Sequence, residues 1–260
     1  MSKILSIDTT AFSIGLALLR DGKIAVEKKI EDSGIAEHLM SNIQKLLSEE
    51  KIGFDDLDKI AVITGPGSYT GIRSGLATVI GICSGASKKI LVVPISKLQV
   101  QAYFGVRHVI GAKVVDGKVI SPMIFSYLSA NDAEYFVSIY YARLSSECKD
   151  VIGNMGLDPI ISESTLVMKN KKNGFTLYEI MSPTSVLKTE AQAFMDKLLP
   201  PLRTNDPINV ATRAMDITHI NYASMAAEMA EVMPGTAKIN DLTPLYIKPV
   251  NAKTLAERGL

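Results

Sequence analysis

Two segments near the N-terminus combine residue types that could bind an anion. In the first, the apolar run Ile4–Ile7 is followed directly by Asp8, Thr9 and Thr10. A carboxylate and two hydroxyls on a tight turn could hold a phosphate or a nucleotide, because hydroxyls and backbone amides approach an anion closely there. The alternative is an ordinary hairpin turn stabilised by Asp and Thr without a ligand, and the local sequence favours it.

The second segment is the loop Gly65–Arg73, which reads Gly-Pro-Gly-Ser-Tyr-Thr-Gly-Ile-Arg. Its glycines permit unusual backbone angles between a predicted strand and a predicted helix, and this geometry can present free amides to an anion. The loop fits neither the Walker pattern nor the dinucleotide pattern, and a capped helix entry without a ligand is the alternative. Across both segments, the residues assigned to a weak nucleotide or anion site are Asp8, Thr9, Thr10, Gly67, Ser68 and Thr70.

The residue types of metal and covalent catalysis are present without the spacing that catalysis requires. His38, His108 and His219 form no H-x-x-x-H or H-E-x-x-H pair, so we predict no metal site. No G-x-S-x-G motif supports a nucleophile elbow. Cys83 and Cys148 form no C-x-x-C pair, which disfavours a zinc ribbon, a redox dithiol and a disulfide scaffold. We therefore predict no catalytic residue and no cofactor.

The helix predicted over residues 72–86 contains three glycines. Each glycine destabilises a helix interior by about 1 kcal/mol relative to alanine, so we expect a compensating contact. Ala77, Gly81 and Gly85 recur every four residues and form a stripe nearly bare of side chains, which lets another helix approach closely. That helix is either the one predicted over residues 37–50 of this chain or a helix of a partner.

The order of the predicted elements is typical of an α/β protein. Three antiparallel strands precede an amphipathic helix, and two buried strands then flank the glycine-rich helix. A middle region rich in Val, Ile, Phe and Tyr predicts mostly β-structure, and an Ala- and Met-rich helix follows it. The predicted ranges are strands Ile4–Ile7, Ser13–Leu19, Lys23–Ile30, Lys59–Thr64 and Ile90–Ile95, and helices at 37–50, 72–86, 96–104 and 221–233.

We predict two lobes from this pattern and from the length of 260 residues. The first lobe comprises 1–104 plus about 215–250, the second, β-rich lobe comprises about 106–210, and 251–260 forms a C-terminal tail. With 28 Lys and Arg against 27 Asp and Glu, overall charge does not favour binding of nucleic acid or a membrane. No apolar run is long enough for a signal peptide or a membrane span, so we expect a cytoplasmic protein.

Two further segments carry a family resemblance. Pro94–Leu98 reads Pro-Ile-Ser-Lys-Leu, and Thr243–Pro249 reads Thr-Pro-Leu-Tyr-Ile-Lys-Pro. Together with the turn at Asp8 and the loop Gly65–Arg73, they resemble the TsaB (YeaZ) family of bacterial tRNA threonylcarbamoyladenosine biosynthesis proteins. The resemblance runs in register over about the first 100 residues. It implies an actin/Hsp70-like (ASKHA) α/β fold of two lobes.

The resemblance also implies a non-catalytic scaffold. Such a subunit pairs with a TsaD-like catalytic subunit, works with a TsaE-like ATPase and the carboxylate-activating TsaC, meets tRNA only through the complex, and forms a homodimer when alone. The complex transfers threonylcarbamoyl to the adenosine beside the tRNA anticodon. The pairing face would comprise the helices at 37–50 and 72–86. Its implied residues are Leu39, Ile43, Leu46, Ile72, Leu76, Ala77, Ile80, Gly81 and Gly85.

The alternative function is an independent ASKHA-type small-molecule kinase or ATPase that uses Asp8 and the loop at 65–71. It requires nucleotide turnover by the isolated chain. A metalloprotease would require bound zinc, which the histidine spacing disfavours. Residues 106–121, with an Asp116-Gly117 turn, look like an insertion relative to the family, and this leaves any ligand role of the second lobe open.

Overall fold

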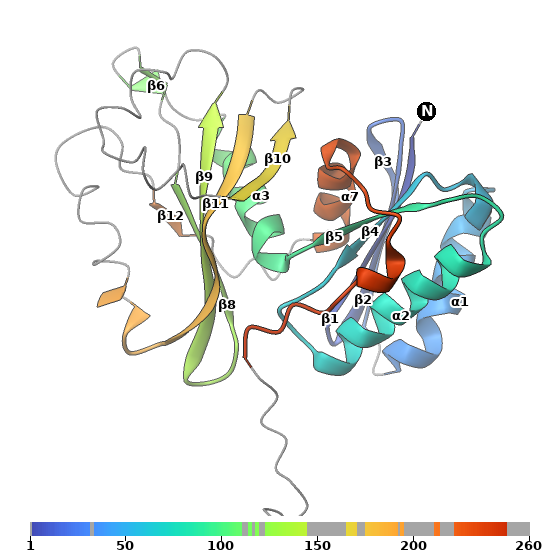
Figure 1. The fold of residues 1–260 in the computed structure, drawn as a ribbon, viewed down its shortest axis with the longest axis horizontal. Coiled ribbons are helices and arrows are strands. Elements are labelled where there is room, and N and C mark those ends of the chain that lie inside the picture. Colours follow the sequence, from blue (N-terminus) through green and yellow to red (C-terminus); the bar gives the residue numbers. More distant parts are fainter. Residues whose placement is uncertain are drawn as a thin grey trace, which may run out of the picture.

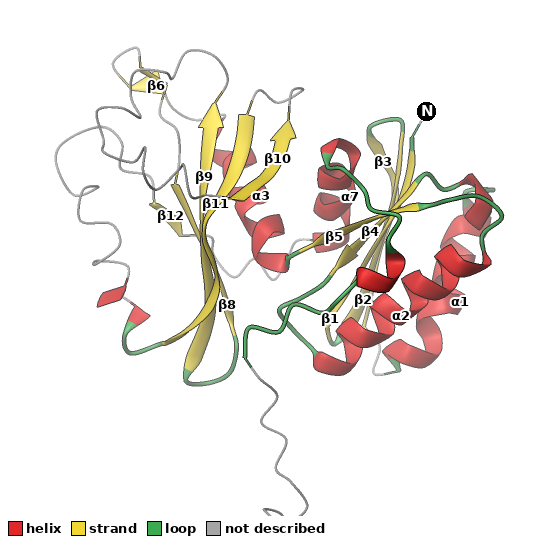
Figure 2. Ribbon diagram, in the orientation of Figure 1, coloured by secondary structure: helices red, strands yellow, loops and turns green. Residues whose placement is uncertain are grey.

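The structure is a computed structural model, and it describes residues 2–31, 34–110, 114–115, 118–119, 123–144, 165–170, 175–191, 193–194, 211–213 and 221–248. Helices and two separate five-stranded sheets make up this part of the chain (Figures 1 and 2). The predicted α/β class is confirmed. The predicted tail at 251–260, Cys148 and His219 lie outside the described residues, as does the side chain of His108.

The first sheet has the strand order β3-β2-β1-β4-β5. Strands β1 to β3 pair antiparallel, as predicted, and β4 and β5 lie parallel to β1. Nearly every residue of β1 and β2 is buried, because helices cover both faces of the sheet. The strands are β1 (Lys3–Ala11), β2 (Ser13–Arg20), β3 (Lys23–Glu31), β4 (Lys59–Ile63) and β5 (Leu91–Ile95).

Two helices, α1 (Ile35–Glu49) and α2 (Tyr69–Gly85), cover one face of this sheet (Figure 1). Successive strand residues point to opposite faces, so Leu5 packs with these helices while Ile4 packs on the other side. The helical periodicity at 37–50 and 72–86 therefore predicted both helices correctly, to within three residues at each end.

The second sheet has the strand order β10-β11-β9-β8-β12. Its pairs are antiparallel except for β12, which lies parallel to β8. A separate pair, β6 (Val114–Val115) and β7 (Lys118–Val119), flanks the predicted Asp116-Gly117 turn, whose own residues lie outside the described part. The strands of the sheet are β8 (Met123–Ser129), β9 (Glu134–Leu144), β10 (Thr165–Asn170), β11 (Phe175–Leu187) and β12 (Ala211–Arg213).

Helices α3 (Lys97–Ile110) and α7 (Tyr222–Val232) lie between the two sheets, and their buried residues form one cluster with both (Figure 1). Ser96 Oγ accepts a hydrogen bond from Leu98 N at 3.2 Å, so the predicted cap of α3 is confirmed. The predicted end of this helix at 104 is wrong. The β-branched residues from Val106 onward suggested a strand, but the helix continues to Ile110. Val106 is buried in the shared core like Tyr103 before it, and this packing overrides local propensity.

After α7 the chain runs back along the first sheet as an extended segment. Thr236 forms a two-way backbone bridge with Val92, and Leu245 N donates to Thr64 O at 2.9 Å. Two single turns of 3-10 helix complete the described elements, η1 (Phe54–Asp56) and η3 (Ile239–Asp241). Within the described residues, no helix has both the length and the apolar character needed to cross a membrane.

Candidate functional site

The turn after β1 is closed by its own side chains. Asp8 Oδ1 accepts hydrogen bonds from Thr10 N at 2.9 Å and from Thr10 Oγ1 at 2.6 Å. Asp8, Thr9 and Thr10 are all buried, and Asp8 is only 8% exposed. One carboxylate oxygen is therefore used within the turn, which is the arrangement of a hairpin turn stabilised by Asp and Thr.

Lys97, the first residue of α3, faces the other carboxylate oxygen of Asp8. Its Nζ lies 3.8 Å from Asp8 Oδ2, donates to Thr10 Oγ1 at 2.9 Å, and stands 4.4 Å from the ring centre of Tyr222 on α7. Lys97 is 9% exposed, so these partners replace most of the water that would otherwise surround its ammonium group. Sequence reasoning missed this residue. The available signal was its place directly after β5, because parallel strands end at the same edge of a sheet.

The glycine loop meets the same turn. Ser68 N donates to Thr10 O at 2.7 Å, and Ser68 Oγ accepts from Gly71 N at 3.2 Å, which caps α2. A Cβ at Gly67 would overlap the Thr10 carbonyl oxygen, so the two segments touch backbone to backbone. The structure thus brings the predicted anion residues together, except for Thr70, an exposed residue in the first turn of α2. Most of the polar groups described in these two segments form hydrogen bonds within or between the segments.

The partner face implied by the resemblance divides into two opposite sides. Its five large apolar members are core residues on the inner sides of α1 and α2 against the sheet: Leu39, Ile43, Leu46, Ile72 and Leu76. Their assignment to a contact surface is corrected, because a side chain inside the core cannot also touch a partner. The sheet, and not a second protein, covers this apolar stripe.

The small members of the implied face point outward. Ala77, Gly81 and Gly85 are exposed, and Ile80 is half-buried. A Cβ at Gly81 or at Gly85 would have no heavy atom within 4 Å. Contact with α1, one of the two explanations for the glycines, is therefore wrong for Gly81 and Gly85. The stripe along the outer side of α2 is open.

An aromatic cluster that sequence reasoning did not predict extends this stripe toward the start of α2. Tyr69 and Arg73 precede Ala77 at the same spacing of four residues. The Arg73 guanidinium lies 3.8 Å from the ring centre of Tyr69, and its Nε donates to the hydroxyl of Tyr246 at 2.9 Å. The two tyrosine rings stack at 5.2 Å. The bond to Tyr246 raises the pKa of the Arg73 guanidinium, so the cluster carries a permanent positive charge at an exposed site.

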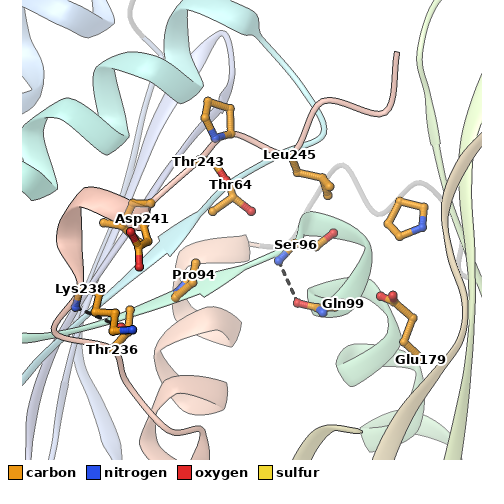
Figure 3. A pocket seen from close by; sticks show the side chains of 13 residues that line it. Thr64, Pro94, Ser96, Gln99, Glu179, Thr236, Lys238, Asp241, Thr243 and Leu245 are labelled. Carbon is orange, nitrogen blue, oxygen red and sulfur yellow. Dashed lines mark hydrogen bonds between the residues drawn. The ribbon is translucent and has the colours of Figure 1, made fainter. Parts of the chain in front are cut away.

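A pocket of about 370 Å³ lies between the two sheets. The end of β5, the start of α3, strand β11 and the segment after α7 line it (Figure 3). None of the predicted anion or partner residues is among the lining residues. Burial raises the pKa of the Glu179 carboxyl on β11, which forms part of its wall.

Among the described residues, no group of three or more His, Cys, Asp or Glu side chains could hold a metal ion. Two of the three histidine side chains, His108 and His219, lie outside the part that the structure describes. The sequence-based expectation that the chain has no metal site and no cofactor stays a prediction.

Fold and surface together define an α/β protein whose two sheets enclose α3 and α7 and whose α2 exposes a small-residue stripe. Residues 33–160 match the model of a protein family that is described as TsaD, tRNA N6-adenosine threonylcarbamoyltransferase. Two curated relatives are each named tRNA threonylcarbamoyladenosine biosynthesis protein TsaB. The Bacillus subtilis (strain 168) protein is 38% identical over 84 residues, which are 28% of this chain and 32% of the relative. The Haemophilus influenzae protein is 29% identical over 99 residues, which are 38% and 41% of the two chains.

The fold has a solved counterpart. A crystal structure from Pseudomonas aeruginosa, described as an uncharacterized protein with similarity to peptidase YeaZ, covers 95% of this chain and 100% of its own. Its TM-score is 0.55 at 16% identity, so the likeness concerns the fold. The predicted resemblance to the TsaB/YeaZ family is confirmed by the curated TsaB relatives, over part of the chain. It spans between 32% and 41% of the length of the curated relatives described above.

Proposed function

We propose that this chain is a non-catalytic subunit of the complex that transfers threonylcarbamoyl to the adenosine next to the tRNA anticodon. It binds a TsaD-like catalytic subunit through the outer side of α2. The names of the TsaB relatives support the pathway. The open stripe of Ala77, Gly81 and Gly85 supports the mode of contact.

The main evidence for this proposal is the exposure of Gly81 and Gly85 on α2. Gly81 lies in the interior of α2 and destabilises the helix by about 1 kcal/mol relative to alanine, and Gly85 is the last residue of the helix. No atom of the described chain uses the space that their missing side chains leave. A partner's helix can use it, because two helices without side chains between them approach closely and gain contact along their backbones. The stripe therefore destabilises the isolated chain but allows close contact with a helix of a partner.

The remaining parts of the assignment are proposals of the same kind. The chain folds as two ASKHA lobes, with residues 1–104 and about 215–250 in the first and about 106–210 in the second. A TsaE-like ATPase joins the complex, tRNA meets this subunit only within it, and the isolated chain forms a homodimer through the same stripe. Arg73, held between Tyr69 and Tyr246, adds a fixed positive charge at one end of the contact.

The alternative, an independent ASKHA-type kinase or ATPase, would rely on the turn at Asp8. In the structure the two carboxylate oxygens of Asp8 face Thr10 and Lys97, so they stabilise the turn and the start of α3. A catalytic carboxylate for phosphoryl transfer must instead reach a metal ion or a nucleophile. The internal pairing therefore favours a structural role for Asp8.

Reconstitution tests the proposal. The TsaD-like subunit of the same organism, mixed with its other partners, tRNA, threonine, bicarbonate and ATP, should form threonylcarbamoyladenosine only when this chain is added. The isolated chain should show no ATP turnover that Asp8→Ala abolishes. Full modification without the chain, or steady ATP hydrolysis by the chain alone that Asp8→Ala removes, would contradict the assignment.

A further inference from the structure

The pocket between the two sheets is separate from both the α2 stripe and the turn at Asp8. Thr64 and Ser96 follow β4 and β5 at its first-sheet side, and Gln99 projects from the first turn of α3. Glu179 of β11 closes the side formed by the second sheet. Figure 3 shows Glu179 across the pocket from Asp241, which lies on η3. Any ligand that fills the pocket touches both sheets.

Glu179 is held in place on the second-sheet side. Its Oε2 accepts from the buried Tyr140 hydroxyl at 3.3 Å, its Oε1 accepts from Ser182 Oγ at 3.2 Å, and Gln99 also hydrogen-bonds to it. The Gln99 side chain is itself fixed, because its Oε1 accepts from Ser96 N at 2.9 Å. The pairing of β11 with β9 is irregular on the C-terminal side of Glu179, and such bulges redirect side chains next to binding sites.

The carboxylate of Glu179 has hydrogen-bond donors around it but no positive charge among the described residues to balance it. Three hydrogen-bond donors surround Glu179, yet its pKa stays raised because burial outweighs them. No cationic side chain among the described residues forms an ion pair with it. A positive charge entering the pocket would supply the stabilisation that the protein does not.

The rest of the lining also suits a cation. Asp241, which is exposed and has no side-chain partner among the described residues, adds a second carboxylate to the lining. The exposed Lys238 adds the single ammonium group. Lys97, which begins α3 beside the pocket, is already occupied by Asp8 and Thr10. Phosphate groups would therefore meet an excess of negative charge. Pro94 and Pro183 also line the pocket and provide apolar surface for a short carbon chain.

We propose that the inter-sheet pocket binds a small aliphatic amine, with one ammonium group at Glu179, the carbon chain against Pro94 and Pro183, and a second amino group toward Asp241. A volume of about 370 Å³ accommodates a molecule of this size. The bound amine connects the second sheet to the segment after α7 and so holds the two sheets together. This inference does not depend on the partner surface of α2.

Titration of the full chain with putrescine, followed by calorimetry and by NMR shifts, tests the proposal. We expect saturable binding of one putrescine per chain, with shifts at Ser96, Gln99 and Glu179. Charged hydrogen bonds are strong, so Glu179→Gln should weaken binding at least tenfold. Asp241→Asn should weaken it several-fold. Glu31→Gln, an exposed carboxylate of β3 outside the pocket, is the matched control and should bind normally.

Inorganic phosphate and ATP serve as the anionic probes. Binding of either one in the pocket in preference to putrescine would overturn the proposal. So would the absence of saturable putrescine binding at millimolar concentration, or equal affinity in wild type and Glu179→Gln. If Glu179→Gln does not fold, Asp241→Asn decides the matter, because Asp241 is exposed and its substitution leaves the core intact. Unchanged affinity in Asp241→Asn would then refute the two-ended mode of binding.

Discussion

Helix α2 carries glycines in both of its halves, and their surroundings differ. In the first half, a Cβ at Gly71 would overlap the Thr9 carbonyl oxygen, and one at Gly75 would overlap Thr9 Oγ1. In the second half, Gly81 and Gly85 have no neighbour that a Cβ would touch. The first pair lets the helix pack against the end of β1. The second pair makes room for no contact within the described chain, so we propose that a partner packs against it.

The largest effect should come from Gly71→Ala. The added methyl group meets backbone of β1, which cannot rotate away as a side chain could, so we expect a loss of about 3 kcal/mol in the free energy of unfolding. Urea denaturation followed by circular dichroism measures it. Gly85→Ala is the matched control in the same helix. Equal stability of the two variants would remove the distinction between the halves.

A second, somewhat smaller effect is expected from Lys97→Met. The substitution leaves Asp8 buried without its positive partner, which should lower the free energy of unfolding by about 2 kcal/mol. Adding Asp8→Asn should restore part of this loss, because the uncompensated charge disappears. If the double variant instead shows the full sum of two independent losses, the Asp8–Lys97 pair does not brace the turn.

In the open half of α2, substitution should stabilise the isolated chain. Gly81→Ala gains helix propensity without a clash, so the free energy of unfolding should rise by about 0.8 kcal/mol. Thermal denaturation of the variant at low protein concentration, where self-association is minimal, measures this gain. A decrease in stability would show that Gly81 makes an intramolecular contact after all.

The smallest predicted effect concerns pH. The pKa of Glu179 is higher in the folded chain than in the unfolded chain because burial disfavours the carboxylate. Between these two pKa values the folded state binds more protons, so this group's contribution to stability is present below the unfolded pKa and declines as pH rises through the folded pKa. The stability of wild type relative to Glu179→Gln should therefore fall from about pH 4 toward neutral pH. If the difference in stability between wild type and Glu179→Gln did not change with pH, burial would not raise the pKa of Glu179.

Local patterns in the sequence predicted the helices α1 and α2, the three N-terminal strands and the cap at Ser96, because spacing and turn residues encode them directly. They did not show what covers each helix face. Leu39 and Ile43 share a stripe with the periodicity of either a core or an interface, and only the position of the sheet decides between the two.

Contacts between residues that are far apart in the sequence could not be predicted from local patterns. Lys97 is remote from Asp8 in sequence, and their pairing follows from the order of β1, β4 and β5 in the sheet. Glu179 and Asp241 line the same pocket only because β11 and the segment after α7 both border it. The glycine stripe was predicted, since its spacing is local, although its open surroundings required the structure.

The central claim, that the open half of α2 is the surface for a partner, is tested most directly by measuring the affinity of the TsaD-like subunit for three variants. Gly81→Leu and Gly85→Leu should fold with unchanged or higher stability and bind at least tenfold more weakly, because bulk separates the two helices. Ala25→Leu, a small exposed residue of β3, should bind as wild type does. Wild-type affinity in both glycine variants would contradict the account.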